Sequence, residues 1–206
     1  TQVTILGAGT VGEYAARAAL GLGADVRVFD NAISRLRRLQ NSIGVRVSTS
    51  TIQPKVLSKA LMRADVAIGA IRSLTGRTPC VVSEEMVRNM KPSSVIVDVS
   101  IDQGGCFETS KITTHDNPTF RVHDVIHYCV PNIASRASRT ASHALSNVTA
   151  PLSMKIGDEG GLENTIRNNH GIQNGVYLYN GTLTNQYLGE SLRLPFKDLK
   201  LLLAAF

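Results

Sequence analysis

Apolar, β-branched runs alternate with helix-forming segments along the first hundred residues. Several of the short runs are apolar at consecutive positions, which is typical of strands covered on both faces. The runs that predict strands are Gln2–Leu6, Val26–Phe29, Val45–Thr49, Asp65–Ile71 and Ser94–Ser100. The segments between them that predict helices are Glu13–Leu22, Ile33–Gly44, Pro54–Arg63 and Glu84–Met90. Strands that alternate with helices at this spacing predict an α/β fold with a doubly wound parallel sheet.

The pattern loosens after Phe107. Residues Arg121–His127 predict one short strand, and Ser138–Ile156 predict one long helix that Pro151 is expected to kink. The shorter elements expected after that helix are Asn164–Asn169 (helix), Val176–Tyr179 (strand), an Asn180-Gly181 turn, and Asn185–Leu192 and Pro195–Phe206 (helices). The regular alternation of strand and helix is therefore confined to the first part of the chain.

A glycine pattern follows the first expected strand directly. Gly7, Gly9 and Gly12 are spaced as G-x-G-x-x-G, and a helix-forming segment follows. In this context the first glycine permits a tight turn, the second leaves room for a pyrophosphate, and the third allows close packing of helix on strand. The free N–H groups of the helix start then favour phosphate. The pattern predicts a Rossmann-type dinucleotide-binding fold.

A carboxylate ends the second expected strand. Asp30 lies about 20 residues beyond the glycines, where a carboxylate suits the two ribose hydroxyls of an adenosine and repels an additional 2′-phosphate. The cofactor expected is therefore NAD rather than NADP. Two alternatives stay open: Asp30 is a solvated surface residue, or the basic residues Arg35, Arg37 and Arg38 soften the preference for NAD.

A second carboxylate follows the fifth expected strand. Ligands of parallel sheets bind outside the carboxyl ends of the strands, and Ser100–Gly105 lies there. Asp102 in this segment is a candidate to bond the nicotinamide ribose or to handle a proton beside it. The alternative is a turn aspartate held by its own backbone.

Composition narrows the partners. The 22 Lys and Arg residues exceed the 16 Asp and Glu residues, but they are scattered, so we expect anionic small molecules and no nucleic acid. No apolar stretch is long enough to span a bilayer, and no membrane partner is expected. The three cysteines, Cys80, Cys106 and Cys129, show no metal-ligand spacing. They favour a reduced, cytoplasmic setting without a metal site.

Four stretches carry a resemblance to a known family: Ile5–Gly12, Met86–Val99, Ile101–Ser110 and His127–Asn132. The chain resembles alanine dehydrogenase and the related α subunit of proton-translocating NAD(P) transhydrogenase. The string Ile101-Asp102-Gln103-Gly104-Gly105-Cys106-Phe107-Glu108 is more specific than the glycine pattern and favours the dehydrogenase. One departure is Arg72-Ser73-Leu74, which replaces a more apolar, proline-containing loop of the family.

The resemblance implies roles for particular residues. Those that would hold the pyrophosphate are Gly7, Gly9, Thr10, Val11 and Gly12. Those that would contact the rest of the cofactor are Asp30, Arg35, Gly69, Ala70, Ile71, Val130 and Ile133. Asp102 matches the family's active-site aspartate and would also contact the cofactor.

The implied reaction is NAD-dependent oxidative deamination of L-alanine, with an amino acid and a 2-oxo acid as small-molecule partners. Residues 1–138 would form the NAD-binding domain, and residues 139–206 would be a long helix and a segment that returns to a substrate domain. In the family the substrate residues precede this stretch, so we expect an upstream segment and no alanine turnover without it. The resemblance also implies a homo-oligomer, a hexamer.

Three alternatives remain open at this stage. The chain is the nucleotide-binding domain of a transhydrogenase α subunit, a non-catalytic NAD-binding regulatory domain, or part of an amino-acid dehydrogenase with another substrate. The five histidines do not match the family's catalytic histidine, so we interpret each of them as a loop or core residue.

Overall fold

The computed structural model describes residues 1–73 and 76–204. The chain divides into two compact units, which we call unit 1 (Thr1–Ile133) and unit 2 (Ala134–Phe206). Leu74, in the loop that differs from the family, lies outside the described residues. So do residues 205–206 at the end of the last expected helix. The division at residue 133 concerns compactness alone, and the functional division at residue 138 stays a prediction.

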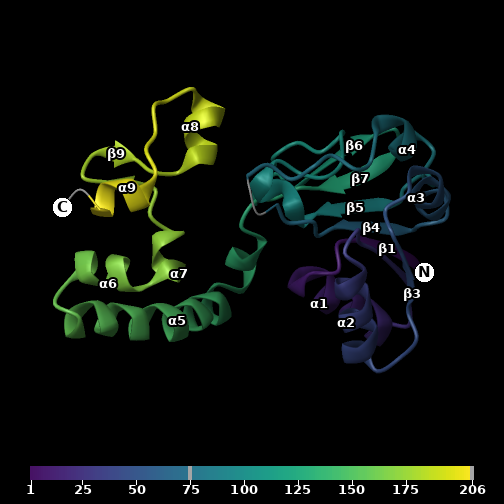
Figure 1. Cartoon of the computed structure of the whole chain (residues 1–206). Coiled ribbons are helices and arrows are strands. Elements are labelled where there is room, and N and C mark those ends of the chain that lie inside the picture. Colours follow the sequence, from purple (N-terminus) through teal and green to yellow (C-terminus); the bar gives the residue numbers. More distant parts are fainter. Residues whose placement is uncertain (74–75, 205–206) are drawn as a thin grey trace. The chain divides into compact units, whose positions relative to one another are not determined.

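Unit 1 is built on one twisted sheet (Figure 1). Among the described residues it has seven strands in the order β3-β2-β1-β4-β5-β7-β6. All neighbours run parallel except β6, which is antiparallel to β7. The strands are β1 (Gln2–Leu6), β2 (Asp25–Phe29), β3 (Ser48–Ser50), β4 (Val66–Gly69), β5 (Val95–Asp98), β6 (Thr119–Val122) and β7 (Val125–Tyr128). Chain order reverses direction at β1 and β4, which is the place where doubly wound sheets bind ligands.

Helices cover both faces of this sheet. The helices are α1 (Thr10–Gly21), α2 (Ile33–Ile43), α3 (Pro54–Leu61) and α4 (Glu84–Arg88). Leu36 and Leu39 of α2 pack with Val28 in one buried cluster, and Leu61 of α3 packs with Ile96 in another. The α/β class and the doubly wound architecture predicted from the sequence are therefore confirmed, with α1 and α2 on one face and α3 and α4 on the other (Figure 1).

The sheet differs from the sequence-based expectation at its two edges. The single strand expected over residues 121–127 is wrong: His123 and Asp124, with φ of 50° and 60°, form a two-residue turn that splits it into β6 and β7. At the other edge β3 begins at Ser48 rather than Val45. The Gln40 side chain bonds both the N–H and the C=O of Val47, so this backbone is satisfied outside the sheet.

Unit 2 is dominated by one helix, α5 (Ser138–Asp158), which contains Pro151. The predicted long helix is thus confirmed, although it continues two residues beyond the expected end at Ile156. The elements that follow are α6 (Leu162–Asn168), α7 (His170–Gln173), β8 (Leu178–Tyr179), β9 (Thr182–Leu183), α8 (Gln186–Leu192) and α9 (Leu199–Ala204). The last helix begins later than the expected Pro195.

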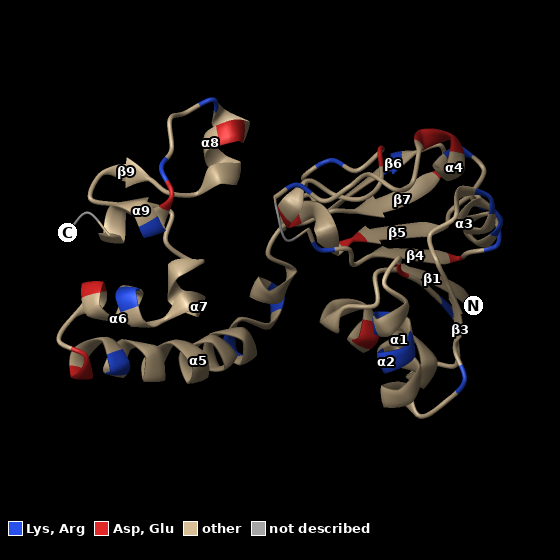
Figure 2. Cartoon of the chain, viewed as in Figure 1, with Lys and Arg blue, Asp and Glu red and all other residues tan. Residues whose placement is uncertain are grey.

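The charged residues are distributed in the structure as the sequence predicts. Basic and acidic residues are interspersed over the elements of both units (Figure 2). Within the described part of the chain, no helix combines the length and apolar character that crossing a membrane requires.

Candidate cofactor-binding site

The glycine turn joins β1 to α1 and has the geometry that its spacing predicts. Gly7 has φ +109°, and a Cβ there would lie 2.4 Å from the carbonyl oxygen of Ala70. A Cβ on Gly12 would lie 1.8 Å from the carbonyl oxygen of Gly7, so α1 packs directly on the turn. A Cβ on Gly9 would meet no atom within 4 Å. Gly7 and Gly12 are therefore required by packing, whereas Gly9 faces open space.

Asp30 lies beside this turn at the end of β2 and is 6% exposed. Its Oδ2 accepts a hydrogen bond from the Ala8 N–H at 2.8 Å, and its Oδ1 accepts one from the Ala32 N–H at 2.7 Å. Arg35 Nη1 lies 3.8 Å from Oδ2. Two backbone donors and one cation hold this carboxylate in a fixed orientation against the glycine turn.

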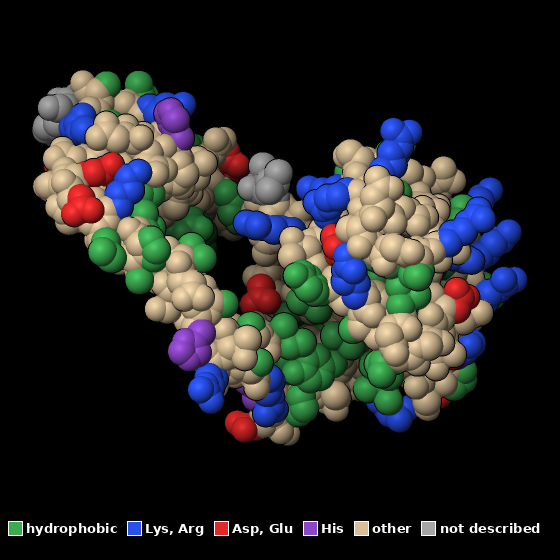
Figure 3. All heavy atoms as spheres, turned by 90° about the horizontal axis from the view of Figure 1, so that it is seen from below, with side chains coloured by type: hydrophobic (Ala, Val, Ile, Leu, Met, Phe, Trp, Pro, Cys, Tyr) green, Lys and Arg blue, Asp and Glu red, His purple; other side chains and the backbone are tan. Residues whose placement is uncertain are grey.

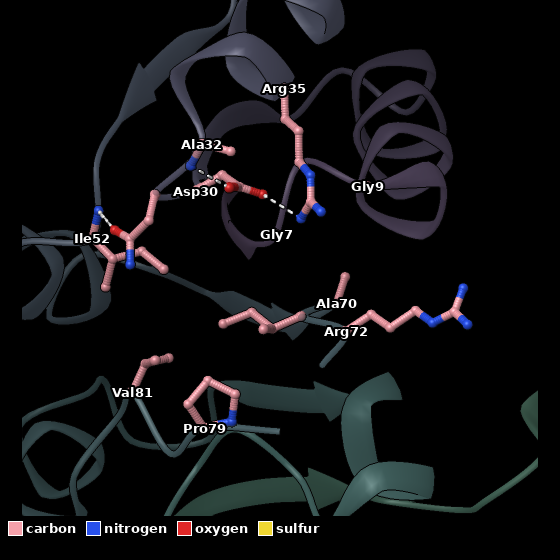
Figure 4. A pocket seen from close by; sticks show the side chains of 12 residues that line it. Gly7, Gly9, Asp30, Ala32, Arg35, Ile52, Ala70, Arg72, Pro79 and Val81 are labelled. Atoms are coloured by element: carbon pink, nitrogen blue, oxygen red, sulfur yellow. Dashed lines mark hydrogen bonds and ion pairs between the residues drawn. The ribbon is translucent and has the colours of Figure 1, made fainter. Parts of the chain in front are cut away.

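A pocket of about 280 Å³ opens in front of Asp30 (Figure 4). Its residues come from the carboxyl ends of β1, β2, β3 and β4 and from the loop after β4. They are Gly7, Gly9, Asp30, Asn31, Ala32, Arg35, Ile52, Ala70, Ile71, Arg72, Pro79 and Val81. Figure 4 shows the Asp30 carboxylate close to Gly7 and facing Arg35, with Pro79 and Val81 across the pocket. One polar wall and one apolar wall suit an adenosine, whose ribose is polar and whose base is flat.

A second pocket of about 280 Å³ continues from the first, with which it shares Ala70, Ile71 and Arg72. Its other lining residues are Val11, Val99, Ser100, Asp102 and Gln103. Asp102 lies in the 3₁₀ helix η1 (Val99–Gln103), and its Oδ1 accepts a hydrogen bond from the Asn132 N–H at 2.8 Å. The structure thus places Asp30 and Asp102 in two adjoining pockets, which share the wall formed by Ala70, Ile71 and Arg72.

Asp98, which is not among the residues predicted from the sequence, supports the loop that carries Asp102. This carboxylate is 1% exposed and accepts hydrogen bonds from the Ser100 N–H, the Cys106 N–H and the Ser110 hydroxyl at 2.7–3.0 Å. Ser100 in turn accepts a bond from the Ile71 N–H at 3.0 Å, which joins this loop to the one after β4. The structure ends β5 at Asp98, whereas the sequence pattern predicts a strand that continues to Ser100.

Gly69 belongs to the same support. A Cβ at this position would lie 2.6 Å from both Asp98 Oδ1 and Cys106 Sγ. Gly69 therefore lets the end of β4 approach the buried carboxylate, and it does not line either pocket.

The remaining buried reactive groups are held in unreactive forms. Burial, followed by the charge of Asp98, raises the pKa of the Cys106 thiol well above its usual value, so the thiol stays protonated. Burial lowers the pKa of His127, whose ring lies between Thr109 Oγ1 at 2.8 Å and the Val125 carbonyl oxygen at 3.0 Å. His127 is thus a neutral core residue, as the sequence analysis interpreted it.

Four other candidates lie away from the pocket walls. Thr10 and Gly12 belong to the first turn of α1, Val130 is 4% exposed, and Ile133 is half-buried; none of the four lines either pocket. Their contacts with a cofactor stay predictions.

Six wall residues of the first pocket were missed: Asn31, Ala32, Ile52, Arg72, Pro79 and Val81. Ile52 follows β3, so the rule that ligands bind at the carboxyl ends of strands would have found it. Pro79 and Val81 lie in an irregular loop, where no periodic pattern marks them.

The residues present fit a dinucleotide. The first N–H groups of an α-helix have no partner within the helix, and here the open space at Gly9 lies in front of them. A diphosphate at this position would receive backbone donors and the positive end of the helix dipole. The two adjoining pockets then offer space on both sides of it.

Fold and site together define a Rossmann-type dinucleotide-binding domain. A family model described as alanine dehydrogenase/PNT, C-terminal domain, matches residues 1–186. Alanine dehydrogenase of Mycolicibacterium smegmatis is 42% identical over 197 residues, which cover 96% of this chain and 53% of that relative. A solved structure of L-alanine dehydrogenase is similar with a TM-score of 0.83 at 36% identity, over 93% of this chain and 53% of its own.

The chain therefore belongs to the alanine dehydrogenase/PNT family and corresponds to its C-terminal domain. NAD is the cofactor expected of this domain. A transhydrogenase structure from Sinorhizobium meliloti, with a TM-score of 0.66 at 24% identity over 75% of this chain and 44% of its own, shares the fold alone. The chain spans about half the length of the curated relatives it matches.

Proposed function

We propose that this chain supplies the NAD-binding part of an alanine dehydrogenase, which oxidises L-alanine to pyruvate and ammonia. The observation that carries the proposal is the position of Asp30, a fixed carboxylate in a pocket beside an open glycine turn. The curated relatives, named alanine dehydrogenase, support the substrate. The string at Ile101–Glu108 supports the dehydrogenase over the transhydrogenase.

Asp30 selects the cofactor in this proposal. Its carboxylate accepts the ribose hydroxyls of the adenosine and repels a 2′-phosphate, since like charges brought together cost several kcal/mol. Arg35 partly offsets this repulsion, because it lies 3.8 Å from the carboxylate and is exposed.

Asp102 acts at the other end of the site. Its Oδ1 is engaged by the Asn132 N–H, and the carboxylate lines the second pocket. The group then orients the nicotinamide ribose or holds a proton next to the reacting carbon. When bound, NAD supplies the hydride acceptor, and the chain supplies orientation and charge.

A titration with two cofactors tests the proposal. We expect NADH to bind more than about 10-fold more tightly than NADPH, and Asp30→Asn to reduce this preference. Asp116→Asn removes a carboxylate from an exposed loop and serves as the matched control. Equal binding of NADH and NADPH, or no binding of either, would contradict the assignment.

Alanine dependence tests the substrate. The gene product that contains this chain is expected to form NADH when L-alanine and NAD are supplied, and Asp102→Asn is expected to abolish most of this rate. Formation of NADH from another amino acid alone would replace the proposed substrate. Exchange of hydride between NADH and an NADP analogue would favour the transhydrogenase instead.

The assembly and location are further parts of the proposal. We infer a homo-oligomer, with six copies as the resemblance implies, in the cytoplasm. The three cysteines are unpaired, which supports a reducing compartment. Light scattering of the purified protein measures the number of copies directly.

A further inference from the structure

The junction of the two pockets is lined by one cation, Arg72, to which the sequence pattern assigns no role. Arg72 lines both pockets, which share only Ala70 and Ile71 besides it. It lies three residues beyond β4 and is exposed. Figure 4 shows its side chain running past Ala70 and away from Asp30.

Of the two arginines that line the pockets, Arg35 and Arg72, only Arg72 lines both of them. Arg35 is paired with Asp30, and Asp102 at the far end adds a second carboxylate. Within the described residues Arg72 makes no hydrogen bond or ion pair. A dinucleotide that spans the groove places its diphosphate between two carboxylates, which repel it unless a positive charge lies at the junction.

The start of α1 lies at the same junction. Gly9 lines the first pocket together with Arg72, and Val11 lines the second pocket together with Arg72. An arginine fork bonds phosphate oxygens through paired N–H groups, which backbone donors of a helix start complement.

We propose that Arg72 binds the diphosphate of the cofactor together with the first turn of α1. The inference rests on the proposed function and extends it: in this chain an arginine side chain supplements the backbone amides at a position where the family's loop is apolar. The contact is solvent-exposed, so its contribution falls as salt rises.

The contact is tested by measuring the binding of three probes to the wild-type protein and to two variants. NADH and ADP-ribose both carry the diphosphate. Arg72→Leu is expected to weaken the binding of both by the same factor of about 10 at low salt. Adenosine, which lacks phosphate, is expected to change less than about 2-fold. Arg46→Leu is the control, because Arg46 is also exposed but precedes β3, whereas Arg72 follows β4 at the carboxyl end of the sheet.

The outcomes separate the two proposals. Unchanged NADH binding by Arg72→Leu, with wild-type affinity intact, overturns the role of Arg72 and leaves the NAD site standing. Equal weakening of adenosine and ADP-ribose also overturns it, since Arg72 would then support the adenosine pocket. If the wild-type protein binds neither NADH nor ADP-ribose, the result contradicts the proposed function itself. Retention of the wild-type melting temperature shows that each variant is folded.

Discussion

The two units of the chain bury their apolar residues to very different extents. Unit 1 contains two clusters of buried residues, one on each face of its sheet. In unit 2 the buried apolar cluster consists of Ile166, Tyr179, Leu199 and Leu203, and none of the residues of α5 is buried. Apolar side chains are visible at the surface of both units (Figure 3), but in unit 2 they include most of those on its longest helix. Unit 1 thus has a buried core on each face of its sheet, whereas unit 2 has one small buried cluster.

This difference matters for function because the whole candidate site lies in unit 1. Asp30, Asp102 and the glycine turn are fixed by hydrogen bonds within that unit. Cofactor binding should therefore depend on the core of unit 1 and respond little to substitutions in unit 2.

The largest expected effect comes from Gly12 in the glycine turn, with Gly9 of the same turn as the comparison. Gly12→Ala places a Cβ 1.8 Å from a backbone oxygen, so we expect it to lower the free energy of unfolding of unit 1 by more than about 4 kcal/mol. Gly9→Ala meets no atom and should stay within about 0.5 kcal/mol of wild type, yet weaken NADH binding. Denaturant unfolding followed by circular dichroism, with NADH titration, measures both. Similar stability of the two variants would contradict the packing argument.

The second effect compares one leucine from each unit. Leu39 on α2 is fully buried, and Leu39→Ala is expected to cost about 2–5 kcal/mol. Leu145 on α5 is 66% exposed, and Leu145→Ala should cost less than about 0.5 kcal/mol. Hydrogen exchange resolves the two units separately. A large cost for Leu145→Ala would mean that α5 is packed in the protein as purified.

The third effect is a pH dependence confined to unit 1. Burial holds the pKa of folded His127 below its ordinary value of 6.5. As pH falls through 6.5 the unfolded chain takes up a proton that the folded chain does not, so the free energy of unfolding falls. The free energy of unfolding changes by at most about 1.4 kcal/mol per pH unit from this residue. The change ends below the pKa of folded His127, where both states carry the proton.

His127→Phe isolates that slope. The variant loses the bond to Thr109, which lowers stability at every pH, but its stability should fall less steeply between pH 6.5 and lower values. Parallel curves for the two proteins would show that the pKa of His127 is not lowered in the folded state. Thermal melts across this pH range provide the comparison.

The smallest effect tests the limited packing of unit 2. The Tyr179 hydroxyl donates to Glu163 at 3.0 Å, and Glu163 is largely exposed. Tyr179→Phe should therefore cost no more than about 1 kcal/mol in unit 2 and leave the melting of unit 1 unchanged. A larger loss would indicate that this bond organises the unit.

The sequence predicted the parts of the fold that local physics determines. Buried strands and the glycine turn carry strong local signals, and the ends of the strands located Asp30 and Asp102. The turn between β6 and β7 was missed because both residues have positive φ without a glycine, and His123-Asp124 is an unusual pair for such a turn. The register of β3 was missed because a side chain, Gln40, satisfies the backbone there.

The site was predictable only in part, for a similar reason. Residues that follow strands were located, whereas the pocket wall at Pro79 and Val81 depends on the path of an irregular loop. Support by Asp98 depends on donors brought together from separate positions along the chain, such as Ser100 and Ser110, and no single stretch of sequence contains that information.

The bond from Ala8 to Asp30 has a consequence for redesign. The same carboxylate that would discriminate between cofactors also ties down the glycine turn. An attempt to switch the protein to NADP by replacing Asp30 alone would remove this anchor together with the repulsion. The glycine turn would then be mobile, and the entropy lost when NADP orders it would offset the affinity gained from the absent repulsion. A successful switch needs a neutral acceptor for the Ala8 N–H as well as a cation for the added phosphate.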